Sequence, residues 1–234
     1  MRLEKLREQV CNANKRLSEC GLVILTWGNA SAYSPQDGLV VIKPSGIAYD
    51  DLTPEKMVLV DLNGSVVEGG LQPSSDTQTH LELYKRYPSI GSIVHTHSPW
   101  ATIWAQMGEC IPPLGTTHAD DFYGQISCTR ALTAEEIERD YEKNTGKVIL
   151  ETLEQNDIQK QFGVLVRAHG PFVWEQSPQK AVEKAMVLEQ VAMMAWHCRV
   201  CNPVCHEMST ALMEKHFERK HGTHAYYGQK RGDS

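Results

Sequence analysis

The sequence lacks any apolar run close to the roughly 20 residues that a helix needs to cross a bilayer. It also lacks an excess of positive charge, because 23 lysines and arginines stand against 29 aspartates and glutamates, for a net charge of −6. Without a basic field, the composition argues against a nucleic-acid-binding protein, and an anionic substrate must be held by local positive groups. The first residues are charged and typical of a helix rather than a signal peptide, so we expect a soluble, cytoplasmic protein.

The seven cysteines lack the even number and regular spacing of a disulfide framework. We expect reduced thiols, as in cytosolic proteins. One group could hold a structural zinc: His197, Cys198, Cys201, Cys205 and His206 lie close together in the sequence. Structural zinc sites usually combine ligands from two separated pairs, and no second CxxC pair is present. We therefore favour the interpretation that these thiols line the end of a long helix.

No repeat, linker or low-complexity stretch interrupts the chain, and 234 residues with 41% hydrophobic content fit one domain spanning residues 1–234. Short apolar runs between glycine, proline and asparagine predict strands at 22–26, 39–42, 58–60, 90–97, 163–167 and 172–174. Apolar residues at helical spacing predict helices at 3–17, 100–107, 133–143, from 178 past 195, and 210–220. The pattern predicts an α/β domain whose helices flank a sheet with short antiparallel connections.

Local signals set several helix boundaries. Gly21 and Gly108 are placed to end the first two helices. Serine–proline pairs at 98–99 and 177–178 have the form of an N-cap followed by proline in the first turn. Thr133 and Glu136 have the spacing of a capping box.

A candidate metal site begins with His95 and His97 at the end of a predicted strand. Side chains alternate along a strand, so both imidazoles point to the same face, where they could bind one zinc ion. His169 follows another predicted strand. Three histidines with an open position are typical of a catalytic rather than a structural zinc. Alternatively, His169 is a turn histidine bonded to a backbone carbonyl.

Three loops carry small polar residues beside predicted strand ends: residues 27–31, 43–46 and 73–76. Glycine lets backbone N–H groups approach a ligand, and serine hydroxyls add further donors. Together with Lys43 they could hold a phosphate without a large basic patch. None of them has the spacing of a Walker or Rossmann phosphate loop, and ordinary turns use the same residues.

In combination, these motifs resemble those of the class II aldolase and epimerase family over essentially the whole chain. The matching segments are LTWGN at 25–29, IKPSG at 42–46, PSSDT at 73–77, IVHTHS at 93–98, ATIWAQ at 101–106, GTTHAD at 115–120, HGPF at 169–172, KHG at 220–222 and AYYGQ at 225–229. The resemblance implies a three-layer α/β/α fold around a central, largely antiparallel sheet. It also implies a homotetramer with active sites between neighbouring subunits.

The resemblance further implies roles for individual residues. Zinc would be held by His95, His97 and His169, with Asp76 as a further ligand or close neighbour; manganese or cobalt could replace zinc. The substrate, chiefly its phosphate, would contact Gly28, Asn29, Ser45, Gly46, Ser74 and Ser75, beside Lys43. Asp120 and Tyr227 match the acid/base pair, Tyr227 serving an adjacent subunit, and His216 matches a histidine near the substrate.

The expected reaction is inversion at C4 of L-ribulose 5-phosphate to give D-xylulose 5-phosphate, by cleavage and re-formation of a carbon–carbon bond. Aldolases of the family carry a glutamate at the position of Asp76, so the aspartate favours the epimerase branch. An aldolase that releases both fragments is the alternative. A zinc hydrolase is disfavoured because the sequence has no HExxH motif. Without the resemblance, Asp120 would be interpreted as a loop or cap residue and Tyr227 as an exposed tail residue.

Overall fold

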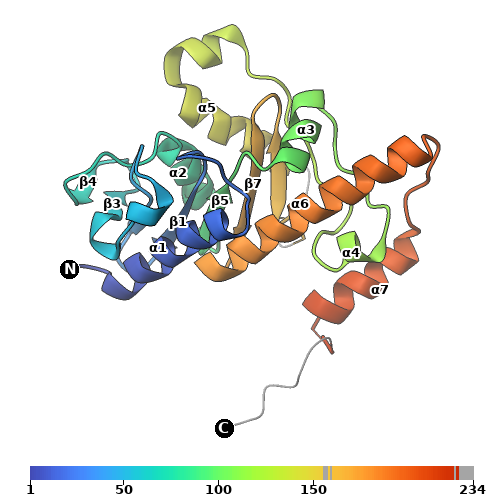
Figure 1. The fold of residues 1–234 in the computed structure, drawn as a ribbon, viewed down its shortest axis with the longest axis horizontal. Coiled ribbons are helices and arrows are strands. Elements are labelled where there is room, and N and C mark those ends of the chain that lie inside the picture. Colours follow the sequence, from blue (N-terminus) through green and yellow to red (C-terminus); the bar gives the residue numbers. More distant parts are fainter. Residues whose placement is uncertain (155–157, 159, 224, 227–234) are drawn as a thin grey trace.

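A computed structural model describes residues 1–154, 158, 160–223 and 225–226 (Figure 1). Its strands are β1 (Asn29–Ser34), β2 (Leu39–Ile42), β3 (Val58–Asp61), β4 (Val66–Glu68), β5 (Ser92–His95), β6 (Gly163–Val166) and β7 (Gly170–Glu175). The α-helices are α1 (Glu4–Glu19), α2 (Thr77–Arg86), α3 (Pro99–Met107), α4 (Thr116–Ala119), α5 (Ala134–Leu153), α6 (Pro178–Cys201) and α7 (Thr210–His221). Two 3₁₀ turns, η1 (Tyr49–Asp51) and η2 (Pro54–Lys56), precede β3. Within the described residues, no helix is both long and apolar enough to cross a membrane.

The strands form one seven-stranded sheet in the order β4-β3-β2-β1-β5-β7-β6. Each pair of neighbours is antiparallel. In this register Asn29 of β1 lies opposite His95 of β5, and His95 lies opposite Phe172 of β7. The start of β1, the end of β5 and the start of β7 therefore meet at the same end of these neighbouring strands.

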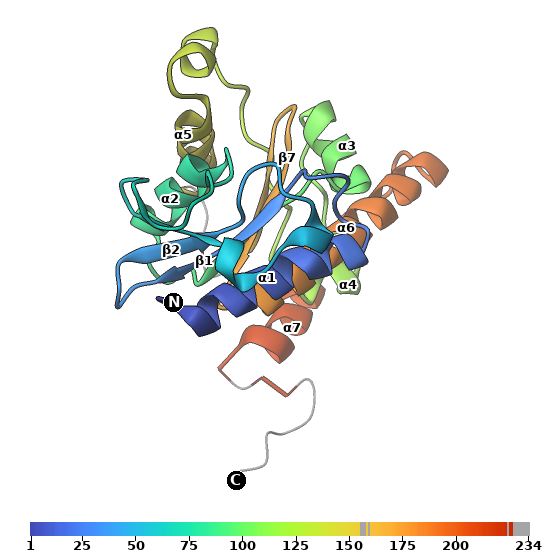
Figure 2. The same cartoon turned by 60° about the vertical axis from the view of Figure 1, so that its left-hand side comes forward.

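Helices cover both faces of the sheet, as Figure 2 shows with α2 and α5 on one side and α1 and α6 on the other. The alternation of side chains in β2 explains this arrangement: Leu39 and Val41 pack with α1, α3 and α6, whereas Val40 and Ile42 pack with α2 and α5. Both sets are buried, and each buried aliphatic side chain stabilises the fold by about 1.5–3 kcal/mol. The three-layer α/β/α architecture is confirmed.

Most predicted helix boundaries are confirmed. Helix α3 follows Ser98-Pro99 and ends at Gly108 with a φ of 71°, and α6 is capped by the Ser177 hydroxyl. The capping box of Thr133 and Glu136 opens α5. This helix runs on to Leu153, ten residues past its predicted end at 143. The helix is broken at Asp140, which has φ −145° and ψ 61°.

The predicted strand at 22–26 is wrong. Leu25 takes the left-handed conformation with a φ of 56°, and Ile24 and Leu25 are exposed. The strand instead begins at Asn29, within a segment predicted as a loop. Two apolar side chains on the surface gave this segment the composition of a buried strand. The strand predicted at 90–97 is shorter, and α2 was not predicted from the sequence.

A buried polar network supports α2 against β1. The Ser31 hydroxyl lies 2.7 Å from His80 Nδ1 and 2.8 Å from the Tyr84 hydroxyl. Burial lowers the pKa of His80 to about 3, so this imidazole is neutral. All three side chains are inaccessible to solvent, and their mutual hydrogen bonds partly offset the desolvation of these polar groups, although His80 Nε2 has no partner among the described residues.

Candidate metal centre and anion site

The three histidines expected from the sequence meet at the end of the sheet where β5 finishes and β7 begins. His95 is the last residue of β5, His97 lies two residues further on, and His169 lies in the turn between β6 and β7. One ring nitrogen from each lies within 4.8 Å of the others. In the part of the chain that the structure describes, no other group of three or more histidine, cysteine or acidic side chains meets this criterion.

The ring of His95 is held in a defined orientation. Its Nδ1 lies 2.9 Å from the carbonyl oxygen of Pro171, and a carbonyl only accepts, so Nδ1 carries the proton and donates it. The ring also stacks on Phe172 at 4.1 Å. The hydrogen bond to Pro171 leaves the lone pair on Nε2, the nitrogen that faces His97.

The spacing of these nitrogens fits a divalent cation. His95 Nε2 and His97 Nε2 are 3.1 Å apart. Two nitrogens bound at about 2.0–2.1 Å to one tetrahedral zinc lie roughly 3.3 Å apart. Three imidazoles are a donor set that suits zinc and other first-row transition metals.

Burial and charge repulsion keep the imidazoles of His97 and His169 unprotonated at neutral pH. Burial, followed by repulsion from His95, lowers the pKa of His97 to about 4. The same two causes lower the pKa of His169 to about 3. A metal ligand must be neutral imidazole, so no proton has to be displaced from these rings near pH 7.

Backbone geometry brings the turn that carries His169 against β5. Ala168 has a left-handed φ of 60°, and the N–H of His169 donates to the carbonyl of Val166. A Cβ at Gly170 would lie 2.7 Å from the carbonyl oxygen of Thr96. Only glycine allows this approach without a shift of one strand.

Asp76 precedes α2 and lies beside the histidines, although it is not one of the three clustered ligands. Its carboxylate accepts a 2.7 Å hydrogen bond from Asn29 Nδ2. Burial would raise the pKa of Asp76, but His95, His80 and His169 lower it further than burial raises it, so the carboxylate is ionised. Its role as a metal ligand stays a prediction.

A cavity of about 590 Å³ joins His97 and His169 to the three polar loops predicted from the sequence. It is lined by Thr26, Trp27, Gly28, Asn29, Lys43, Pro44, Ser45, Gly46, Ser74, Ser75, Asp76, His97, Tyr141, Glu142 and His169. The loops are tied together, because Ser74 N donates to the Lys43 carbonyl and Asn29 Nδ2 donates to Ser74 Oγ at 3.0 Å. The predicted metal and anion sites are therefore two ends of one cavity.

Lys43 supplies the positive charge of this cavity. The side chain is buried, and its Nζ makes only long contacts, at 3.4 Å to the Thr26 carbonyl and 3.3 Å to the Pro44 carbonyl. Burial lowers the pKa of Lys43 to about 8, while Asp76 opposes the shift. Lys43 is therefore still mostly protonated at pH 7, with capacity for an anionic ligand.

Tyr141 and Glu142 also line the cavity, and sequence analysis missed both. They follow the break of α5 at Asp140, and the Tyr141 hydroxyl lies 3.4 Å from His169 Nδ1. The capping box indicated where the helix starts, but nothing in the sequence indicated the break.

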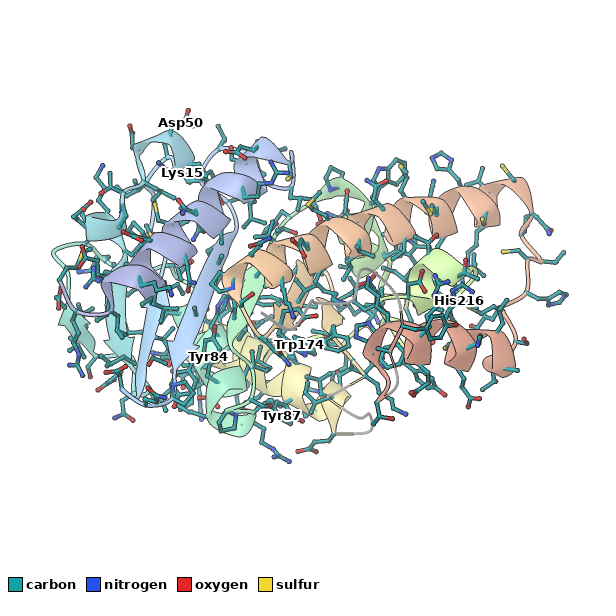
Figure 3. All side chains as sticks on the ribbon, turned by 90° about the horizontal axis from the view of Figure 1, so that it is seen from below. Lys15, Asp50, Tyr84, Tyr87, Trp174 and His216 are labelled. Atoms are coloured by element: carbon teal, nitrogen blue, oxygen red, sulfur yellow. The ribbon has the colours of Figure 1, made fainter. Side chains whose placement is uncertain are left out.

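Asp120 and His216 lie away from the metal group, where α4 contacts α7. Asp120 directly follows α4, and His216, labelled in Figure 3, lies within α7. His216 Nδ1 is 3.0 Å from Asp120 Oδ1, and Arg219 donates to both carboxylate oxygens at 3.0 and 2.7 Å. Neither Asp120 nor His216 lines the metal cavity of its own chain. The predicted catalytic Tyr227 lies outside the described residues.

The cysteine-rich segment does not form a second metal group among the described residues. Cys198 and Cys201 are exposed on the last turns of α6, and all seven cysteines are free thiols. This agrees with the interpretation favoured from the sequence.

Comparisons with known proteins agree on one family. The family model for the class II aldolase and adducin N-terminal domain matches residues 8–196. The chain is 56% identical over 228 residues to proteins named L-ribulose-5-phosphate 4-epimerase UlaF from Salmonella paratyphi C and Salmonella choleraesuis, covering 97% of this chain and 100% of each relative.

Solved structures show the same fold. An L-fuculose 1-phosphate aldolase superposes with a TM-score of 0.78 at 24% identity, covering 92% of this chain and 95% of that chain. The protein YgbL from Klebsiella pneumoniae, titled a putative aldolase/epimerase/decarboxylase, has a TM-score of 0.72 at 21% identity, covering 92% and 99%.

Proposed function

The chain belongs to the class II aldolase and adducin N-terminal domain family, and from that premise we propose that it is an epimerase that converts L-ribulose 5-phosphate to D-xylulose 5-phosphate. The observation that carries this proposal is one cavity lined by Lys43 and by His97 and His169, two members of the three-histidine cluster. The high identity to proteins named as this epimerase supports the choice of substrate.

The proposed reaction breaks and re-forms the C3–C4 bond. C4 of a pentulose lies two bonds from the ketone carbon, so simple deprotonation at C4 gives no stabilised carbanion. Loss of the C4 hydroxyl proton instead cleaves the C3–C4 bond, giving the enediolate of dihydroxyacetone and glycolaldehyde phosphate. Rotation of the aldehyde before the bond re-forms inverts C4, and a proton returned to its oxygen completes the reaction.

The metal ligands in this proposal are His95, His97 and His169, with Asp76 beside them. Bound there, zinc supplies Lewis-acid stabilisation of the negative charge that develops when the carbon–carbon bond breaks. Ionised Asp76 adds negative charge to the ligand set, which favours a divalent over a monovalent cation.

The polar loops and Lys43 bind the phosphate end of the substrate. Lys43 provides the charge, and Ser45, Ser74 and Ser75 provide hydroxyl donors at the loops that line the cavity. These contacts hold the aldehyde fragment while it turns, and they distinguish an epimerase from an enzyme that releases the fragment.

The acid/base pair in this proposal is Asp120 and Tyr227 of an adjacent subunit. Burial would raise the pKa of Asp120, but hydrogen bonds from Arg219 and His216 lower it further, so its carboxylate is ionised, as a base must be. Because Asp120 does not line the cavity of its own chain, we place active sites between the subunits of a homotetramer. The free thiols favour a cytoplasmic enzyme.

The test is turnover of L-ribulose 5-phosphate by purified protein with and without a chelator, following both D-xylulose 5-phosphate and free glycolaldehyde phosphate. We expect D-xylulose 5-phosphate as the main product and loss of turnover after chelation. Tyr227→Phe should reduce the rate severely, with Tyr226→Phe, at an exposed neighbouring tyrosine, as its matched control. Glycolaldehyde phosphate as the main product would establish an aldolase instead.

A further inference from the structure

Tyr49 is a buried tyrosine that lies next to the anion end of the cavity without lining it. It begins the turn η1, whose next residue, Asp50, is labelled in Figure 3. The side chain is only 4% exposed, so its hydroxyl must find a partner within the protein. That hydroxyl lies 2.6 Å from the Trp27 carbonyl oxygen and 2.8 Å from the Gly28 carbonyl oxygen.

These two contacts fix the direction of the loop that opens the anion site. A carbonyl can only accept, so the single phenolic proton is shared between the two oxygens. In a planar trans peptide the N–H points opposite to the C=O, so the N–H of Gly28 is turned away from Tyr49. Gly28 needs its freedom here, because its φ is 80° and a Cβ would lie 2.8 Å from the His95 carbonyl.

The ring of Tyr49 contacts the second component of the anion site. Lys43 Nζ lies 4.9 Å from the ring centroid, over its face. A cation over an aromatic face is attracted by the ring quadrupole without being neutralised by a carboxylate. The two carbonyl contacts of this ammonium are long, so the ring is a substantial part of its support.

We propose that Tyr49 is a positioning residue for the phosphate end of the substrate, its hydroxyl orienting the Trp27–Gly28 peptide and its ring holding the Lys43 ammonium toward the cavity. The residue touches no substrate and acts through these two groups. The inference rests on the proposed function, since it assigns the loops and Lys43 to phosphate binding.

A merely structural tyrosine would behave differently, and the chain offers a matched control. Tyr84 is fully buried, but its hydroxyl is hydrogen-bonded to Ser31, which lies within β1 and does not line the cavity, whereas Trp27 and Gly28 do. Burial raises the pKa of Tyr49 and of Tyr84, so both are neutral phenols. Removing either hydroxyl therefore removes a buried hydrogen bond, but only one of them orients an anion-binding loop.

The experiment compares Tyr49→Phe, Tyr49→Leu and Tyr84→Phe with the wild type in the zinc-loaded enzyme. The readouts are the inhibition constant for inorganic phosphate, KM and kcat for L-ribulose 5-phosphate, bound zinc and thermal stability. Loss of one hydrogen bond to the loop should weaken phosphate binding about tenfold in Tyr49→Phe, with KM rising more than kcat falls and zinc content unchanged. Tyr49→Leu, which also removes the ring face, should weaken phosphate binding further.

Tyr84→Phe should lose stability while keeping wild-type phosphate affinity. The proposal is overturned if Tyr49→Phe binds phosphate within twofold of the wild type, if it loses zinc in parallel, or if Tyr84→Phe weakens phosphate binding equally. Should Tyr49→Leu fail to fold, the two phenylalanine variants decide. A wild type that does not bind phosphate would overturn the anion site itself, which is distinguishable from a failure of Tyr49 alone.

Discussion

His97 lies beyond the end of β5, yet its Nε2 is 3.1 Å from that of His95. Replacing His97 by asparagine removes one of three imidazole donors. Zinc affinity should fall at least about 100-fold, because even the loss of a hydrogen-bond partner of a ligand weakens binding 10–100-fold. Bound zinc after dialysis against a weak chelator measures the effect. The matched control is His206→Asn, at an exposed histidine near the end of α6, and a His97→Asn protein with full zinc would remove His97 from the site.

His118 makes the stability of the fold sensitive to acid. Burial lowers its pKa to about 4, and its Nε2–H donates to the Gly124 carbonyl at 2.7 Å. An unfolded histidine titrates near pH 6.5, at about its ordinary value. Between these two values the unfolded chain binds more protons than the folded one, so stability should fall as the pH is lowered from 6.5 towards 4.

The variant His118→Gln tests this, since its amide can still donate to Gly124. The free energy of unfolding by urea should depend less on pH between 7 and 5 in the variant than in the wild type. Equal slopes would show that other groups, such as the buried His80, dominate the acid response.

At the scale of elements, the close approach of β7 to the segment after β5 positions the metal ligands. Gly170→Ala would place a methyl group 2.7 Å from the Thr96 carbonyl, forcing the strands apart where His95 and His169 meet. We expect a loss of about 1–3 kcal/mol in stability together with weaker zinc binding. Gly70→Ala is the control, because a Cβ there has no neighbour within 4 Å. Unchanged zinc affinity in Gly170→Ala would separate this contact from the site.

Elements with local signals could be predicted from the sequence. Proline and serine at helix starts and glycine at helix ends act within a few residues, and α3, the start of α5 and α6 follow them. The segment at 22–26 could not be predicted correctly, because two of its apolar side chains, Ile24 and Leu25, remain on the surface. The break of α5 at Asp140 could not be predicted either, because no proline or glycine stands at this position to specify it.

The candidate site likewise contains residues that local sequence features predict and residues that only the fold reveals. The spacing of His95 and His97 and the small residues of the loops are local features, and the structure places the histidine cluster beside the cavity that the loops line. Tyr49 and Tyr141 reach that cavity or its loops only through the fold, so their sequence neighbourhoods gave no signal. The separation of Asp120 from the histidines depends on where α4 and α7 lie, which the motifs do not encode.

At the scale of the whole molecule, the metal group and the Asp120 cluster are separate parts of one chain. If one subunit supplies the metal and its neighbour supplies Asp120, inactive His97→Asn and Asp120→Asn proteins should complement each other. Random assembly of equal amounts in a closed oligomer leaves about a quarter of the sites with both parts intact. Turnover after unfolding and refolding the mixture, compared with each variant refolded alone, measures this. No recovery would mean that each chain completes its own site.

The three-histidine group and the Asp120 cluster are stabilised by different interactions. Helix α7 buries Met213 and Phe217, and two ion pairs near its C-terminal end also hold it: Arg219 pairs with Asp120, and Lys220 with Asp121. His95 instead lies on β5, which main-chain hydrogen bonds join to β7, and His97 and His169 lie just beyond the ends of strands. Dissolved ions screen partly exposed charge pairs but leave a backbone ladder intact. Concentrated salt should therefore loosen the contact between α7 and Asp120 while the histidine cluster keeps its geometry.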